Sequence, residues 1–144
     1  MNLENAKFIV ASGPVIIENG KVLLNRHGKT ESEKKYWKFV GGKVSNVDKI
    51  DENTLENVCK REVKEEMGIN IKIIKPLKPM MIKHPEKKGT MVILIHYLAK
   101  RSGKIKSGSE IEEYQWFNIN KLPDNLAPNI KPVIDEYKNQ LIRN

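Results

Sequence analysis

The segment from Thr54 to Gly68 constrains the fold more than any other part of this sequence. Its apolar residues recur at the three- and four-residue spacing of one helix face: Leu55, Val58 and Cys59. Three carboxylates continue the same stripe: Glu62, Glu65 and Glu66. Carboxylates this close repel one another, and burying them unpaired would cost several kcal/mol. We therefore expect a cation beside this helix.

Arg61 offsets part of this charge, because Arg61 and Glu65 form an i,i+4 pair. One guanidinium does not balance three anions. A hard divalent cation, Mg²⁺ or Mn²⁺, suits ligands that are all oxygen and completes its shell with water and phosphate. Residues 51–66 hold six acids and three bases in a chain of net charge +8. This acidic stretch in a basic chain predicts a metal site beside a surface that attracts phosphates.

Taken alone, residues 61–66 are also typical of a solvated helix face with Glu and Lys pairs. The neighbouring residues favour a site. Gly41 and Gly42 follow the aromatic run 36–40 and predict a strand that ends in a turn of close backbone approach. Gly68 stands where a helix C-cap belongs.

The segment resembles the signature of the Nudix hydrolases, G-x5-E-x7-R-E-U-x-E-E-x-G-U, in which U is aliphatic. Residues 61–69, REVKEEMGI, match the second half at every fixed position. The first half departs from the pattern. Counted back from Arg61, the signature glutamate falls on Asn53, and ten residues separate Asn53 from Gly42.

We interpret the departure as a five-residue insertion before the helix, within residues 43–52. Asp51 or Glu52 then takes the place of the missing acid. The longer loop alters substrate choice, or it slows turnover through loss of the first glutamate's supporting role.

The resemblance implies an α/β fold, a Nudix-like α/β/α sandwich in which helices pack on a mixed β-sheet. It implies that Mg²⁺ or Mn²⁺ is held by Glu62, Glu65 and Glu66, and that Glu65 or Glu66 is the general base. Arg61 then orients a carboxylate, and Gly41 and Gly42 let the backbone approach the helix and the metal.

The implied reaction is metal-dependent hydrolysis of a diphosphate linkage in a nucleoside diphosphate joined to a group X. A nucleoside triphosphate or modified nucleotide is the first choice of substrate. ADP-ribose, dinucleoside polyphosphates and RNA 5′ ends remain open. A different class of function also remains open, a catalytically weak module that binds nucleotide or RNA as a sensor.

Further site residues follow from the same resemblance. The charged loop 27–35 lies near the substrate in this family, which makes Arg26, His27 and Lys29 candidate phosphate contacts, although the pattern favours a solvated side chain for any one of them. Trp37 either stacks on a nucleobase or fills the core, and Lys43 is a further candidate for substrate binding. Three acids of the late loop are secondary candidates for the base or an extra metal ligand: Glu110, Glu112 and Glu113.

Periodicity and turn residues predict the remaining elements. The expected strands are 7–17, 21–26, 36–40 and 90–99, a kinked edge strand or two short strands in 69–82, and a strand near 110–117. Asn19-Gly20 predicts a hairpin, and residues 27–35 predict a loop without core residues. Apolar residues predict a C-terminal helix that packs on the sheet: Ile130, Val133, Ile134, Tyr137 and Leu141.

With 144 residues and no apolar run of membrane-spanning length, the chain is expected to form a single domain, 1–144, without a membrane partner. We see no secretion signal at the N-terminus, and the single cysteine, Cys59, fits a cytoplasmic protein and is expected in the core. His96 is expected to be a hydrogen-bonded core residue. A basic chain attracts nucleotides and RNA ends alike. Monomer and homodimer both remain open.

Overall fold

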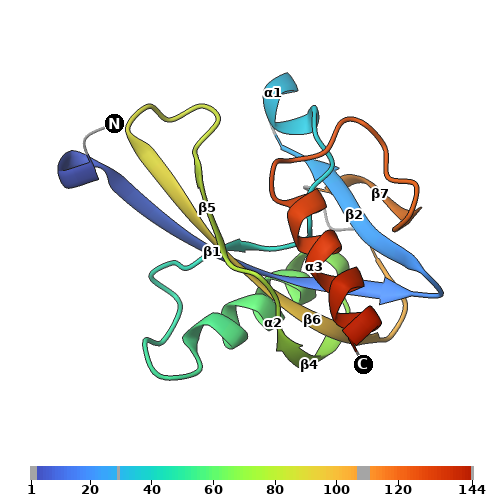
Figure 1. The fold of residues 1–144 in the computed structure, drawn as a ribbon. Coiled ribbons are helices and arrows are strands. Elements are labelled where there is room, and N and C mark those ends of the chain that lie inside the picture. Colours follow the sequence, from blue (N-terminus) through green and yellow to red (C-terminus); the bar gives the residue numbers. More distant parts are fainter. Residues whose placement is uncertain (1–2, 29, 107–110, 144) are drawn as a thin grey trace.

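A computed structural model of the chain describes residues 3–28, 30–106 and 111–143, with the backbone alone for 111 and 112. The elements in chain order are η1 (Leu3–Asn5), β1 (Lys7–Glu18), β2 (Lys21–His27), α1 (Glu31–Lys34), β3 (Gly42–Lys43), α2 (Thr54–Met67), β4 (Asn70–Pro76), β5 (Met80–Lys83), β6 (Thr90–Ser102), β7 (Ile111–Asn118) and α3 (Ile130–Arg143). Figure 1 shows their arrangement. No helix in these described ranges is long and apolar enough to cross a membrane.

The strands form one mixed sheet in the order β4-β6-β1-β2-β7, with β3 paired to β1 and β5 paired to β6. The long central contact is parallel and runs from Lys7 opposite Thr90 to Ile16 opposite Ala99, while the other pairs are antiparallel. Asn19 and Gly20 close the β1-β2 hairpin, both with positive φ. Such a turn matches the twist of the flanking strands, so the predicted hairpin is confirmed.

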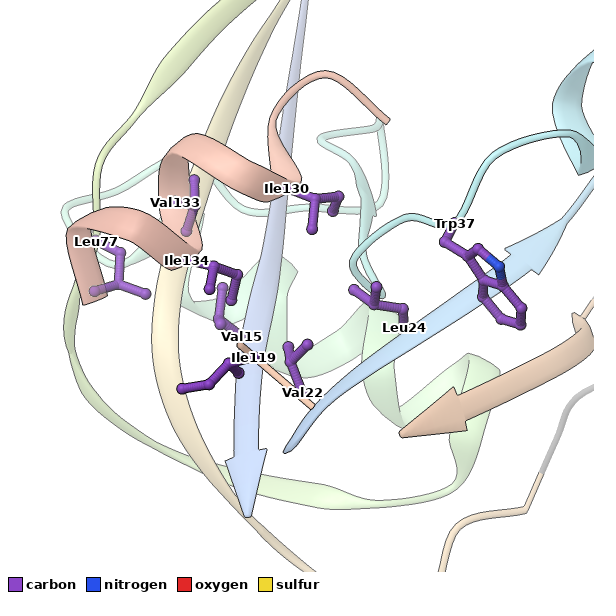
Figure 2. Packing of buried hydrophobic residues seen from close by; sticks show 9 residues of the cluster. All are labelled: Val15, Val22, Leu24, Trp37, Leu77, Ile119, Ile130, Val133 and Ile134. Carbon is purple, nitrogen blue, oxygen red and sulfur yellow. The ribbon is translucent and has the colours of Figure 1, made fainter. Parts of the chain in front are cut away.

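Neighbouring residues of one strand supply two separate cores, because successive side chains in a strand point to opposite faces. Val15 and Leu24 pack in a cluster with α3, whereas Ile16 and Leu23 pack in a cluster with α2. Figure 2 shows the first cluster between α3 and the strands. The helices therefore cover opposite faces of the sheet, which confirms the α/β/α sandwich.

Several sequence expectations are confirmed and others are wrong. Residues 69–82 form two short strands, β4 and β5, and 90–99 lies within the central strand β6. The expected strand 36–40 is not regular: only isolated bridges occur there, from Trp37 to Leu126 and from Lys38 to Asn25. Lys38 bridges to β2 and Trp37 to the segment before α3, so neither neighbour offers a continuous row of hydrogen bonds.

Two further expectations need correction. The loop 27–35 contains the short helix α1, whose first turn is capped by the Thr30 hydroxyl accepting the Glu33 N–H. Leu141 does not join the core that α3 forms with Ile130, Val133 and Ile134, because it is 55% exposed. The last turn of α3 extends beyond the apolar cluster on which the rest of the helix packs.

Candidate active site

Helix α2 carries the candidate site and is fixed at both ends. Asn53 occupies the N-cap position without a capping side-chain bond, and Gly68 ends the helix at φ 69° with its N–H on the Lys64 carbonyl at 2.9 Å. The left-handed conformation at Gly68 favours glycine. On the first turn, the Leu55 carbonyl accepts the Ser12 hydroxyl from β1 at 2.7 Å. The helix is thus held against the central strand.

The buried face of α2 differs from the stripe expected from sequence. Val58 and Cys59 are buried, but Val63 and Met67 continue the face. With about 3.6 residues per turn, these apolar positions stay centred on the sheet. The glutamates instead flank this face, so their side chains reach its rim rather than its centre.

Glu62 is largely enclosed, because its side chain is 14% exposed, against 59% for Glu65. Its carboxyl group lies directly against Gly42: a Cβ added there would come within 2.2 Å of the carboxyl carbon. Burial raises the pKa of Glu62, Arg61 opposes the rise and Glu65 adds to it. A glycine is therefore required at position 42 for Glu62 to occupy this place.

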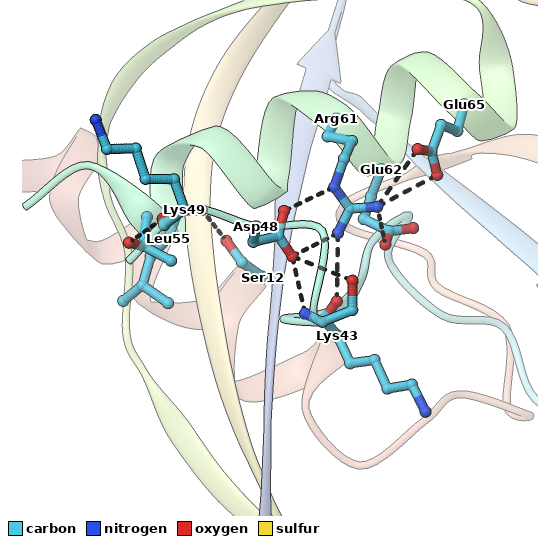
Figure 3. Close-up of polar contacts among 10 residues, drawn as sticks. Ser12, Lys43, Asp48, Lys49, Leu55, Arg61, Glu62 and Glu65 are labelled. Carbon is cyan, nitrogen blue, oxygen red and sulfur yellow. Dashed lines mark hydrogen bonds and ion pairs between the residues drawn. The ribbon is translucent and has the colours of Figure 1, made fainter. Parts of the chain in front are cut away.

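Arg61 holds the acids of the site together, as Figure 3 shows. Its Nε and one terminal nitrogen donate to the two oxygens of Asp48, both at 2.8 Å. Its other terminal nitrogen donates to Glu62 at 3.0 Å and to Glu65 at 3.3 Å. One guanidinium thereby fixes two neighbouring carboxylates of α2 and one carboxylate of the preceding loop.

Asp48 corrects the alignment drawn from sequence. Five residues separate Gly42 from Asp48, the spacing of the signature glutamate, and Asp48 rather than Asp51 or Glu52 meets Arg61. The five extra residues therefore follow this acid, at 49–53. The Arg61 hydrogen bonds and then the Ser45 N–H hold the pKa of Asp48 below its usual range. The sequence signal was present in the forward count from Gly42.

Glu65 and Glu66 both lie beside the buried face of α2, and they differ in exposure. The Glu65 side chain is 59% exposed and pairs with Arg61, while Glu66 is half-buried with one carboxylate oxygen shielded from solvent. Within the described residues, no three His, Cys, Asp or Glu side chains already form a metal cage. The donor set still fits Mg²⁺ or Mn²⁺, because these ions prefer carboxylate oxygens and keep several waters. Glu62 and Glu65 already approach one guanidinium nitrogen.

Arg26 and Trp37 form a packed group away from α2. The Arg26 guanidinium lies 4.3 Å from the centre of the Trp37 ring and pairs with Glu113. Trp37 is 4% exposed. Its ring packs edge-to-face with that of Phe117, with 4.7 Å between the ring centres. Of the two interpretations of Trp37, the structure supports the core one. Because Trp37 belongs to the cluster under α3, Glu113 is engaged on the face opposite the three glutamates.

The other predicted contacts are scattered. Lys43 is exposed on β3, and Figure 3 shows its side chain directed away from Arg61. His27 is half-buried at a register shift between β2 and β7. Lys29 and Glu110 lie outside the described residues, and so does the side chain of Glu112.

Comparison with known proteins decides the family. The NUDIX domain model matches residues 7–137 of this chain. The chain belongs to the NUDIX family. The family supports a pyrophosphohydrolase, generally uses divalent metal ions and implies substrates derived from nucleotides. No curated protein matches the chain.

Solved structures share the NUDIX fold. A MutT NUDIX hydrolase from Burkholderia pseudomallei is 23% identical with a TM-score of 0.75, over 90% of this chain and 98% of that one. The E. coli ORF135 protein is 23% identical with a TM-score of 0.76, over 99% and 97%. A MutT protein from Methanosarcina mazei Go1 is 22% identical with a TM-score of 0.77, over 94% and 96%. Such identities show the fold alone and leave the substrate open.

Proposed function

We propose that this NUDIX protein hydrolyses a diphosphate linkage in a nucleoside diphosphate joined to a group X, with Mg²⁺ or Mn²⁺ as cofactor. A nucleoside triphosphate or modified nucleotide is the first choice of substrate, and residues 1–144 act as one cytoplasmic domain. The observation that carries the proposal is the set of carboxylates that Arg61 holds beside Gly42. A UDP-X diphosphatase of known structure is 19% identical with a TM-score of 0.71, over 94% of this chain and 65% of that one, which supports the substrate class.

The proposed roles follow from burial and charge. Glu62, Glu65 and Glu66 would hold the ion, which supplies charge neutralisation of the diphosphate and lowers the pKa of a bound water. Glu65 or Glu66 would accept the proton of the attacking water. Arg61 bonds both Glu65 oxygens, but these hydrogen bonds are long, 3.3 and 3.4 Å. Arg61 keeps Glu62 and Glu65 in place through its bidentate contact with Asp48. Gly42 leaves room for the Glu62 carboxylate.

The test is phosphate release from a panel of nucleotides in Mg²⁺ or Mn²⁺, for wild type, Glu65→Gln and Glu66→Gln. At least one glutamine variant is expected to lose about a thousandfold in kcat, roughly 4 kcal/mol of transition-state stabilisation. Glu52→Gln is the matched control, because it removes one negative charge from an exposed residue of the preceding loop. The proposal fails if wild type is no faster than both variants on every substrate.

A sensor module is the second candidate, because the extra residues 49–53 lengthen the loop beside the site. This function predicts tight binding of a nucleotide or an RNA 5′ end without turnover. The contact of Asp48 with Arg61 favours the enzyme, because it keeps the carboxylate set tied together despite the insertion. Binding measured beside turnover in the same panel separates the two.

A further inference from the structure

Asn25 of β2 is buried in an unusual way. Its side chain is inaccessible to solvent, and neither the amide nitrogen nor the amide oxygen has a hydrogen-bond partner in the described part of the chain. A buried amide without partners lowers stability, and it calls for an explanation such as a bound group. Asn129, also buried, shows the usual arrangement, because its amide bonds to His96 at 2.9 Å.

Asn25 lies on the face of the sheet that carries the candidate site. It follows Leu23 by two residues, so both side chains point to the same face, and Leu23 packs with Val63 and Met67 of α2. The backbone of Asn25 bridges to Lys38. Three residues separate Lys38 from Gly42, which lets the two lie at most about 13 Å apart. This short stretch joins the bridge at Asn25 to the glycine that contacts the Glu62 carboxylate, and a nucleoside diphosphate is comparable to it in length.

We propose that Asn25 determines substrate specificity by hydrogen bonding to the edge of the substrate's nucleobase. Both ends of the amide lack partners, so the missing group offers a donor and an acceptor side by side. A nucleobase edge offers both, as in the pairing of asparagine with adenine. A phosphate offers acceptors only. The inference rests on the proposed function, because it takes the diphosphate to lie at the glutamates.

Tyr114 is the residue that would have to move to admit a base. It lies directly opposite Asn25 in the β2-β7 pair, so the two side chains share one face. Its exposed fraction is 38%, and a phenol ring is able to stack on a base. Immediately beyond Asn25 the register of β2 and β7 shifts between Arg26 and His27, and such irregularities are common next to binding sites.

The test is binding, which does not depend on turnover. The probes are α,β-methylene analogues of ADP, GDP, CDP and UDP and, as the probe that lacks a base, the matching methylene analogue of ribose 5-diphosphate, each titrated calorimetrically in Mg²⁺. Wild type is expected to bind one nucleotide about ten- to a hundredfold more tightly than ribose 5-diphosphate. Asn25→Leu is expected to lose that preference and to keep its affinity for ribose 5-diphosphate.

A second measurement separates this role from a structural one. Asn25→Leu replaces an unpartnered amide with an apolar group of similar size, so its Tm is expected to rise. Asn129→Leu is the matched control, and its Tm is expected to fall because His96 loses its partner. Asn25→Ser serves the same binding comparison if the leucine variant misfolds. Unchanged base preference in the folded Asn25 variant, or a fall in its Tm, overturns the inference.

Failure of the inference differs from failure of the proposed function. If wild type turns over nucleotides and Asn25→Leu keeps the base preference, only the role of Asn25 is wrong. If wild type binds a nucleotide through Asn25 without turnover, only hydrolysis is wrong. If wild type binds none of the nucleotides, both are wrong.

Discussion

The two faces of the sheet are built from the same strands, but they differ in the residues they carry and in the roles proposed for them. On the α3 face, Val15 and Leu24 meet Ile134 in a cluster of apolar side chains. On the α2 face, Ile16 and Leu23 meet an apolar layer that is rimmed by carboxylates. The α2 face also contains the unpartnered amide of Asn25. Strand alternation thus separates the residues that stabilise the fold from those proposed to act on a substrate.

The largest effect is expected on the α3 face. Ile134→Ala removes a side chain that is 0% exposed, and such truncations cost about 2 to 5 kcal/mol through lost burial and the remaining cavity. Urea unfolding measures this loss. At a temperature where the variant is folded, its kcat/KM is expected to equal that of wild type.

Leu141→Ala is the matched control in the same helix. Leu141 is 55% exposed, so its truncation is expected to change the free energy of unfolding by no more than about 0.5 kcal/mol. If Ile134→Ala instead loses kcat/KM while folded, the two faces are coupled and the proposed separation is wrong.

A smaller effect, measured in activity, is expected on the α2 face. Asp48→Asn keeps the size of the side chain but removes the charge that binds Arg61 at 2.8 Å. Partners that orient metal ligands are worth about 10- to 100-fold in metal affinity or activity. We expect that loss in kcat/KM, with a higher Mn²⁺ concentration for half-maximal rate.

Two variants make this result specific. Asp48→Glu restores the charge and is expected to recover part of the activity. Asp51→Asn removes an exposed carboxylate that accepts the Asn53 N–H at 2.8 Å, and it is expected to leave kcat/KM unchanged. Equal losses in Asp48→Asn and Asp51→Asn would show that loop charge, rather than the Arg61 contact, supports the site.

The sequence predicted the parts of this comparison that depend on local pattern. The hairpin at Asn19-Gly20, the central strand and the amphipathic α3 follow from turn residues and periodicity. The acidic residues of α2 were also visible, but the face that α2 buries was not, because the stripe drawn through Glu62 and the real face through Val63 share Val58 and Cys59. Glu62 belongs to the candidate site and the next residue, Val63, belongs to the core.

Long-range contacts were beyond the sequence. Asp48 meets Arg61 across a separation of 13 residues, and counting back from the helix placed the missing acid elsewhere. The burial of Trp37 depends on Arg26 and Phe117, which come from two other strands. The lack of a hydrogen-bond partner for the Asn25 amide depends on all the side chains packed around it. The last two facts require the packed structure, whereas the forward count from Gly42 already pointed to Asp48.

The pH dependence of stability sharpens the account of the α3 face. His96 is buried, its Nδ1 bonds to the Lys78 carbonyl at 2.8 Å and its Nε2 meets Asn129. Burial lowers the pKa of His96 below its ordinary value of 6.5. The unfolded chain therefore binds more protons than the folded chain just below pH 6.5, so this residue makes stability fall as pH drops through that range.

Urea unfolding from pH 7.5 to pH 5 measures this contribution. The free energy of unfolding of wild type is expected to fall more steeply than that of His96→Gln, which has no titrating ring. Carboxylates such as Asp48 affect both proteins alike, so the difference between the two slopes isolates His96. Parallel slopes would contradict the buried neutral imidazole.

The smallest expected effect is the absence of a reaction at Cys59, on the α2 face. Burial raises the pKa of Cys59 to about 12, so at pH 8 only about one thiol in ten thousand is ionised, and the thiolate is the reactive form. A disulfide reagent is expected to label folded wild type only as fast as the chain opens, and denatured protein at once. The labelling rate of Ile134→Ala is expected to rise by the same factor as its population of opened molecules, because a global opening exposes both faces together. Rapid labelling of folded wild type would instead show that α2 separates from the sheet while the α3 core stays closed.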